Sequence, residues 1–283
     1  MTLEALNSSV DPLGSADMTD GAHPLGEPAP AAASSGAGTA LTLKAVTKVY
    51  GRGPRAVLAV DRLDLTVAAG EFVCLVGASG CGKSTLLSMV SGLEPLTSGS
   101  IDKAGKAAQM FQESALFPWL TVRRNVELAL KLRGVGRSER TDRAADLLDT
   151  VHLSAFADKR PHELSGGMRQ RVALARTLAQ DAAVLLMDEP FGALDAMTRD
   201  VLHDELERIC RERQLSVLFV THNVREAARL GDRIVLLSSR PGRVVAEFPV
   251  DIPRPRRIDS PEIALLAASV TDQLRQEVRR HGK

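Results

Sequence analysis

The hydrophobic positions along the chain fall into short apolar runs and longer amphipathic segments. Continuous runs rich in β-branched residues predict buried strands at 71–76, 184–190, 217–220 and 234–237. Alternating runs at 41–46 and 57–67 predict further strands, and 244–250 is predicted to pair with 234–237. Apolar residues at helical spacing predict helices after Thr85, over 138–151, after Ser165, after Asp195 and from Pro261 onwards. Strands that alternate with helices predict an α/β fold.

Two segments show neither the alternation typical of a strand nor the spacing typical of a helix. Residues 97–100 are predicted to form a turn, because Ser, Thr and Gly make up the segment. Residues 110–122 mix aromatic side chains with a proline and one lone amide, Gln112, so they predict neither a simple helix nor a simple strand. Gln112 is a candidate Mg²⁺ ligand or water-orienting group, although a solvated glutamine is the better interpretation of the residue alone.

The pattern divides the chain into three parts. Residues 1–40 are rich in Ala, Gly, Ser and Pro and carry Asp and Glu but no Lys or Arg, which predicts a disordered acidic tail. Residues 41–250 form the predicted folded domain. Residues 251–283 are predicted to be a linker and a helix with Ile263, Ala267 and Val270 on its apolar face.

Composition excludes several classes of protein. The 283 residues are 44% hydrophobic and 25% charged, which is typical of a globular protein. A net charge of +1 gives no electrostatic case for a nucleic-acid partner. No uncharged apolar run reaches about 18 residues, so no membrane span is expected, and no Sec-type signal is visible. Cys74, Cys81 and Cys210 lie far apart, which favours reduced cytosolic thiols over disulfides or zinc ligands.

Residues 77–85 carry the first candidate chemistry, in the order Gly77, Ala78, Ser79, Gly80, Cys81, Gly82, Lys83, Ser84 and Thr85. They fit the phosphate-binding loop pattern G-x-x-x-x-G-K-[ST], between the strand and the helix that the pattern requires. The glycines let backbone N–H groups reach phosphate, and Lys83 suits the β- and γ-phosphates. Ser84 can offer its hydroxyl to Mg²⁺, with Thr85 as a second polar contact. A chance glycine-rich turn would not account for the flanking elements. Cys81 is a potential oxidant target, but a small space-filling role is favoured.

A second potential anion site precedes a predicted helix. Ser165, Gly166 and Gly167 stand at its start, with Ser165 as the natural N-cap. In isolation an ordinary helix cap is the better interpretation.

Three polar residues stand at predicted strand ends. Asp188 and Glu189 close a buried strand, where Asp188 would hold a metal mainly through its water and Glu189 would act as general base. Neighbouring side chains on a strand point to opposite faces, so the two acids can have separate roles. His222 follows the strand at 217–220 and is placed to reach a γ-phosphate. A solvated acid pair and a structural histidine are the alternatives.

This ordered set resembles the nucleotide-binding subunit of ABC transporters. The matching residues are Tyr50, 77–85, Gln112, Leu164-Ser165-Gly166-Gly167-Met168-Arg169-Gln170, 184–190, Asp195 and His222. The resemblance implies an α/β P-loop NTPase of the ABC ATPase type, with a mixed or parallel sheet core, an antiparallel β subdomain and a helical subdomain that bears the Ser-Gly-Gly signature. It also implies ATP and Mg²⁺ as ligands.

The resemblance assigns further roles. Tyr50, which alone would be taken for a core or surface residue, is expected to stack on adenine. Gln112 is expected to sense the γ-phosphate and link to the membrane subunit, and His222 to contact the γ-phosphate. Two copies are expected to pair head to tail, so that residues 165–167 of one copy close over ATP on Lys83 of the other, with Asp195 relaying between the sites.

The finer resemblance is to importer subunits of the nitrate, sulfonate and taurine type. It rests on residues 111–122 and on Arg240-Pro241-Gly242-Arg243 leading to Pro253-Arg254-Pro255-Arg256. It implies an ATPase at the cytoplasmic face of the cell membrane, with integral-membrane permease subunits and a periplasmic or lipoprotein substrate-binding protein as partners. The alternatives are a non-transport ABC ATPase acting on DNA or ribosomes, and a generic phosphate-loop kinase or GTPase.

Overall fold

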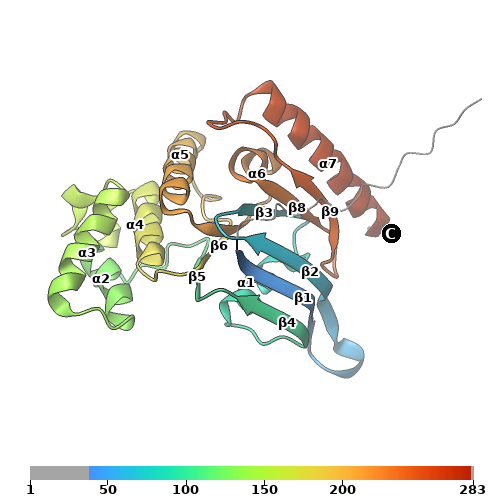
Figure 1. Cartoon of the computed structure of the whole chain (residues 1–283), viewed down its shortest axis with the longest axis horizontal. Helices are drawn as coiled ribbons and strands as arrows, with labels where there is room; N and C mark the ends of the chain where they lie inside the picture. The colour runs from blue at the N-terminus through green and yellow to red at the C-terminus, as the bar shows by residue number, and fades with distance from the viewer. Residues whose placement is uncertain (1–37, 282–283) are drawn as a thin grey trace, which may run out of the picture. The chain divides into compact units, whose positions relative to one another are not determined.

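The computed structural model describes residues 38–281, which lie within one compact unit (Figure 1). The predicted acidic tail therefore falls outside the described residues, apart from residues 38–40. The strands are β1 (Thr39–Tyr50), β2 (Val57–Ala68), β3 (Phe72–Val76), β4 (Ser98–Lys103), β5 (Ala107–Met110), β6 (Val184–Asp188), β7 (Ser216–Val220), β8 (Arg233–Leu237) and β9 (Val244–Pro249). The α-helices are α1 (Lys83–Ser91), α2 (Val122–Leu132), α3 (Arg137–Thr150), α4 (Gly166–Leu178), α5 (Ala196–Arg213), α6 (Val224–Leu230) and α7 (Pro261–His281).

A six-stranded sheet forms the centre, in the order β5-β6-β7-β3-β8-β9. The first five strands in this order are parallel to their neighbours, and β9 pairs with β8 in the antiparallel direction. Strand β3 is buried along its whole length and lies between β7 and β8, as its unbroken apolar sequence predicts. The loop that follows β3 therefore begins at the middle of the sheet's carboxyl edge.

A second, antiparallel sheet has the order β2-β1-β4. The prediction of a turn at 97–100 was wrong in part, because Ser98–Ser100 belong to β4. Gly99 explains the ambiguity: it has φ of +93°, and a Cβ there would stand 2.4 Å from the Ala45 carbonyl oxygen. A glycine in this strand therefore reflects close backbone approach at an irregularity of β1, where the register shifts between Lys44 and Thr47.

The alternating side chains of β3 belong to two hydrophobic cores. Phe72, Cys74 and Val76 pack into the core shared with α2 to α6. Val73 and Leu75 pack into the other core, with the antiparallel sheet and α1. The central sheet is thus covered on both faces, which fixes the strand ends against the elements that carry the functional loops.

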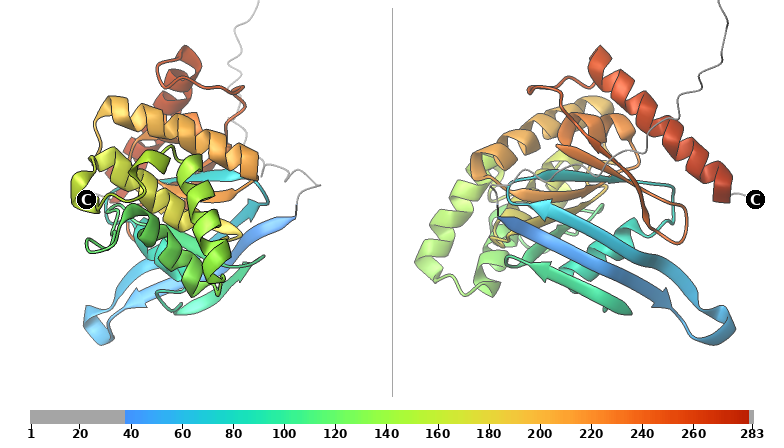
Figure 2. Two further views of the ribbon diagram at one scale, coloured as in Figure 1. Left: turned by 90° about the vertical axis from the view of Figure 1, so that its left-hand side faces the viewer. Right: turned by 45° about the vertical axis from the view of Figure 1, so that its right-hand side comes forward.

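Helices α2, α3 and α4 form a separate group, drawn in green and yellow at the side of the molecule (Figures 1 and 2). Helix α2 contacts both α3 and α4, and α4 connects the group to α5 and β5. The expected apolar face of α3 is confirmed, since Ala144, Leu147 and Leu148 are buried. This group provides the helical subdomain that the sequence predicted.

The C-terminal helix α7 packs against α6 (Figure 2). Ser260 Oγ accepts a hydrogen bond from the Ile263 backbone N–H, which confirms the predicted start of the helix. Ile263, Ala267 and Val270 are buried, as predicted. Among residues 38–281, no helix combines the length and apolar character needed to cross a bilayer.

Candidate active site

The candidate residues converge at the carboxyl edge of the central sheet. Gly77 follows β3, Glu189 follows β6, and His222 lies two residues after β7. These three strands are neighbours and parallel, so their ends meet at one edge. The edge therefore brings a phosphate-binding loop, an acid pair and a histidine together.

The loop at 77–85 folds around the Lys83 side chain. The Lys83 ammonium donates hydrogen bonds to the carbonyl oxygens of Gly77 at 2.8 Å and Ala78 at 3.1 Å and is buried within the loop. Gly82 caps helix α1 with φ of +102°, and a Cβ there would stand 2.8 Å from the Ala59 carbonyl oxygen. The loop thus presents a fixed cation and a helix N-terminus at one place, which is an arrangement suited to phosphate.

Ser84 and Asp188 are in direct contact. The Ser84 hydroxyl donates to the Asp188 carboxylate, and the Lys83 charge lies nearby. Burial raises the pKa of Asp188; the Ser84 hydrogen bond opposes this and the Glu189 charge adds to it. A half-buried carboxylate beside a hydroxyl is an oxygen-donor pair of the kind that Mg²⁺ prefers. The structure therefore brings together two of the residues that the sequence predicts as metal ligands.

Glu189 has an unusual backbone conformation. Its φ is +44° and its N–H donates to the Val220 carbonyl oxygen at 2.9 Å, so it lies outside the strand that ends at Asp188. The expectation that strand alternation separates the two acids was therefore wrong. The sharp turn separates them instead, and it places Glu189 Oε2 at 2.9 Å from His222 Nδ1.

Gln112 lies near Glu189. A Cβ on Gly192 would stand 3.6 Å from Gln112 Nε2 and 3.9 Å from Glu189 Oε2, so Gly192 leaves room between the two side chains. The Gln112 backbone carbonyl accepts a hydrogen bond from Gln170 Nε2 of α4 at 2.8 Å. Helix α4 is thereby tied to the segment that carries Gln112.

The Ser165–Gly167 segment has a different set of neighbours. Ser165 Oγ caps α4 by accepting from the Met168 N–H at 3.3 Å, as predicted. A Cβ on Gly167 would stand 2.5 Å from Thr198 Cγ2. Asp195 caps α5 through the Thr198 N–H, and this hydrogen bond is the main cause of the lowered pKa of Asp195. The segment and Asp195 therefore meet at adjoining helix N-termini.

The candidate residues thus form two groups. One group gathers Lys83, Ser84, Asp188, Glu189 and His222 with Gln112. The other gathers Ser165, Gly166 and Gly167 with Asp195. Gly166 faces Leu194 and Gly167 faces Thr198, on either side of the start of α5, whereas the phosphate loop lies against β2 and β8. Tyr50 lies at the end of β1, is 38% exposed, and has the Lys48 ammonium 4.7 Å from its ring centre.

Two sets of contacts around the site were not anticipated from the sequence. Arg240 Nε donates to the Gly80 carbonyl oxygen at 3.3 Å, which attaches the segment after β8 to the phosphate loop. Arg199 donates to the carbonyl oxygens of Phe191 and Leu194 and so holds the turn between β6 and α5. The only signal for Arg199 was its position four residues after Asp195, within the first turns of a helix.

Comparison with known proteins identifies the family. A family model described as ABC transporter matches residues 60–192. The nitrate import ATP-binding protein NrtD of Synechocystis sp. is 48% identical over 205 residues, which cover 70% of this chain and 77% of that protein. The chain belongs to the ABC transporter ATP-binding family. The taurine import ATP-binding protein TauB of Rhizobium johnstonii is 44% identical over 233 residues, 80% of this chain and 89% of that protein.

Solved structures agree with this assignment. A dimeric ATP-binding cassette in a post-hydrolysis state, bound to ADP and Pi, has a TM-score of 0.67 and 33% identity, with 75% of this chain and all of that chain covered. The ABC ATPase fold predicted from the sequence is confirmed, including its two sheets and helical group. As a member of this family, the chain binds ATP and is an ATPase. The individual roles of the residues in the two groups are proposals, which follow.

Proposed function

We propose that this ABC ATPase is the energising subunit of a membrane importer for a small anion. Relatives named as import ATP-binding proteins for nitrate and taurine support the proposal. The bicarbonate transport ATP-binding protein CmpC of Synechococcus elongatus supports it as well: it is 46% identical over 216 residues, which cover 33% of that protein's length. Nitrate, taurine and bicarbonate share small size and an anionic group. The relatives give no support to an ATPase that acts on DNA or ribosomes.

The hydrogen bond between Glu189 and His222 is the observation that carries the proposed chemistry. The Glu189 carboxylate takes a proton from the attacking water as general base, while His222 fixes the carboxylate through its Nδ1 at 2.9 Å. Lys83 and the N–H groups of the loop hold the β- and γ-phosphates and offset the charge that develops on them. Gln112 borders the same space beside Glu189.

Mg²⁺ fits the contact between Ser84 and Asp188. The Ser84 hydroxyl and the Asp188 carboxylate would hold the ion, Asp188 mainly through a bound water, and Gln112 would complete the set. When bound, the ion supplies positive charge to the phosphate oxygens. Burial disfavours the ionised form of Asp188, and a bound cation would stabilise that form.

Two copies of the chain complete each ATP site in this proposal. Residues 165–167 and Asp195 lie at adjoining helix N-termini, which in this proposal bind phosphate of the partner copy's ATP. A second copy, placed head to tail, brings this terminus onto ATP held by Lys83 and Tyr50 of the first. The dimeric cassette among the solved structures supports the arrangement. ATP then favours the closed pair, and hydrolysis releases it.

A groove beside Gln112 is the proposed contact for the permease. It has a volume of about 500 Å³ and is lined by residues of α1, β5, α2 and α4 and by the segment between β5 and α2. Phe111, Phe117 and Leu132 line it and are exposed, and Trp119 nearby is 67% exposed. Apolar side chains gathered around a hollow are typical of a binding surface. We place the chain at the cytoplasmic face of the membrane, with a substrate-binding protein as the permease's outer partner.

Co-purification tests the proposal. A tagged full-length chain, extracted from native membranes in detergent, is expected to bring down an integral-membrane protein. In proteoliposomes with that protein and its substrate-binding protein, ATP is expected to drive uptake of nitrate, taurine or bicarbonate. Recovery of ribosomes or DNA without a membrane protein would contradict the proposal.

A pair of matched variants tests the groove. Leu132 is 81% exposed in the groove, and Leu265 is 73% exposed on α7 outside it. Leu132→Glu is expected to reduce recovery of the membrane protein, because a charge would be buried on docking. Leu265→Glu is the control and should leave recovery unchanged. Equal recovery with both variants would remove the groove from the interface.

A further inference from the structure

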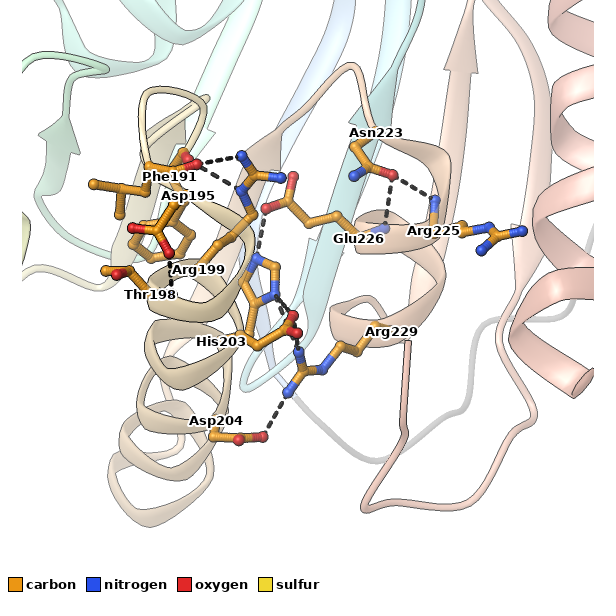
Figure 3. Close-up of polar contacts among 12 residues, drawn as sticks. Phe191, Asp195, Thr198, Arg199, His203, Asp204, Asn223, Arg225, Glu226 and Arg229 are labelled. Atoms are coloured by element: carbon orange, nitrogen blue, oxygen red, sulfur yellow. Dashed lines mark hydrogen bonds and ion pairs between the residues drawn. The ribbon is translucent and has the colours of Figure 1, made fainter. Parts of the chain in front are cut away.

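One fully buried histidine contacts the turn that follows the acid pair. His203 is on α5, the helix that begins after Asp195, and its side chain is 0% exposed. Its ring contacts the Phe191 ring edge-on, with centroids 5.5 Å apart, and Phe191 follows Glu189 by two residues. Figure 3 shows the imidazole between α5 and the segment that carries Glu226. His203 therefore touches the turn after the acid pair from one side.

The hydrogen bonds of His203 connect α5 to two residues of α6. His203 Nδ1 is 3.2 Å from a guanidinium nitrogen of Arg229, and Nε2 is 2.6 Å from Glu226 Oε1. A guanidinium can only donate, so Nδ1 accepts and the ring proton is on Nε2, which donates to Glu226. The imidazole thus bridges an arginine side chain to a carboxylate inside the protein.

The network continues to His222. The second oxygen of Glu226 accepts a hydrogen bond from the Thr221 hydroxyl, and Thr221 directly precedes His222. Thr221 Oγ1 in turn accepts from the Asn223 N–H at 2.9 Å, and Asn223 Oδ1 caps α6 by accepting from Arg225 and Glu226 N–H groups. Both neighbours of His222, Thr221 and Asn223, are thus hydrogen-bonded to Glu226, Thr221 through its hydroxyl and Asn223 through its side-chain oxygen.

The other end of the network is fixed to α5. Arg229 is buried and pairs with Asp200 at 3.2 Å and with Asp204 at 2.5 Å, both on α5. Figure 3 shows the pair with Asp204. Together with the contacts of His203, these ion pairs hold α6 against α5, the helix that Asp195 caps. One buried chain of hydrogen bonds therefore runs from α5 through His203 and Glu226 to Thr221.

We propose that His203 is a positioning residue for ATP hydrolysis, which holds the loop that carries His222 in place relative to Asp195 and Glu189. The inference rests on the proposed role of His222 as the partner of Glu189. If α5 shifts when a second copy contacts Asp195, the network carries that shift to Thr221 and to the adjacent His222. The link is stiff because His203 Nε2, the Glu226 carboxylate and the Thr221 hydroxyl are buried, and each would lose its hydrogen bond if they separated.

The experiment compares three variants of the full-length chain. His203→Leu removes both hydrogen bonds at similar size, whereas His203→Gln offers one N–H and one carbonyl oxygen in their place. Glu207→Gln is the control, because it weakens another buried pair on α5, with Arg254 at 3.0 Å. ATP turnover is measured well below each melting temperature, and ATP affinity is measured by calorimetry.

We expect His203→Leu to lower kcat by about 10- to 100-fold, the loss typical of a misplaced catalytic group, with little change in ATP affinity. His203→Gln should restore most of the turnover, and Glu207→Gln should keep it. Wild-type turnover in His203→Leu, an equal loss in His203→Gln, or a parallel loss of ATP affinity would overturn the proposal. Full activity of His222→Ala would overturn the role of His222 and this proposal with it.

A double-variant cycle tests whether the residues act as one chain. Thr221→Val removes the hydroxyl that connects Glu226 to the His222 loop and is expected to lower kcat as well. Adding it to His203→Leu should cause no further loss, because the link is already broken. Losses that multiply would show that the two residues act separately, and would also overturn the inference.

Discussion

Helix α1 is capped at each end by a glycine at positive φ, and the two positions form a matched pair. Gly82 at its start has φ of +102°, and Gly92 at its end has φ of +82°. A Cβ on Gly82 would stand 2.8 Å from the Ala59 carbonyl oxygen, whereas a Cβ on Gly92 would meet nothing within 4 Å. Replacing each by alanine therefore imposes the same type of backbone penalty, but only Gly82→Ala adds a collision.

The structure gives the size of each effect. A left-handed conformation costs an alanine about 1–2 kcal/mol, so Gly92→Ala should lose that amount of stability. Gly82→Ala should lose about 1–3 kcal/mol more from overpacking, because the Ala59 carbonyl oxygen is held by the Gly242 N–H at 2.9 Å and cannot move freely. At about 2–4 °C per kcal/mol, the melting temperature should fall by about 2–8 °C in Gly92→Ala and by about 4–20 °C in Gly82→Ala.

ATP binding separates the two variants further. Gly82 immediately precedes Lys83, so a shift of the backbone there displaces both the ammonium and the start of α1, and ATP affinity should fall strongly. Gly92 lies at the opposite end of the helix, and its variant should bind ATP normally. Calorimetric unfolding and ATP titration of both variants check this. Equal stability and equal ATP affinity would refute the claim that the contact with Ala59 shapes the loop.

Three further predictions concern the proposed catalytic group. Glu189→Gln should keep ATP binding and stabilise an ATP-bound dimer, with turnover lower by about 10²- to 10⁴-fold because the general base is lost; normal turnover would remove Glu189 from that role. Lys83→Ala should lose nucleotide binding in an ATP titration, and unchanged affinity would contradict the loop assignment. Burial raises the pKa of Asp188 above its unfolded value, so the stability that this group contributes is complete below the unfolded pKa and is lost as pH rises through the folded pKa. Without Mg²⁺, the Asp188→Asn variant should therefore become more stable relative to the wild-type chain as pH rises through that folded pKa. Its Mg²⁺-dependent turnover should be lost. A wild-type chain that becomes more stable than the variant over this pH range would contradict the burial argument.

The sequence predicted the elements whose pattern is local. Strand β3 could be found because five consecutive buried positions leave a run of apolar residues. The loop at 77–85 could be found because close approach to phosphate demands glycines at fixed spacing. The Ser165 cap followed from the same kind of local rule, since a helix N-terminus requires a side-chain acceptor.

The parts that were missed depend on contacts across the fold. The positive φ of Glu189 is set by its N–H bond to Val220, a residue 31 positions away that no local pattern connects to it. His203 occupies a buried site between Leu202 and Leu206, where the helical period predicts only that the face is partly internal. Its partners on α6 become visible only once α5 and α6 are placed side by side.

Helix α4 connects the proposed permease groove to the proposed dimer contact. At its start, Gly167 packs on Thr198 next to Asp195. Along its length, Gln170 donates to the Gln112 carbonyl oxygen, and Arg176 donates to the carbonyl oxygens of Ser114 and Ala115 in the segment that borders the groove. A helix resists bending over this distance, so it cannot move at one end without moving the groove segment at the other. Closure of two copies over ATP would therefore move the surface that contacts the membrane partner, through α4. Through His203 it would also move His222 and Glu189, the proposed water-activating pair.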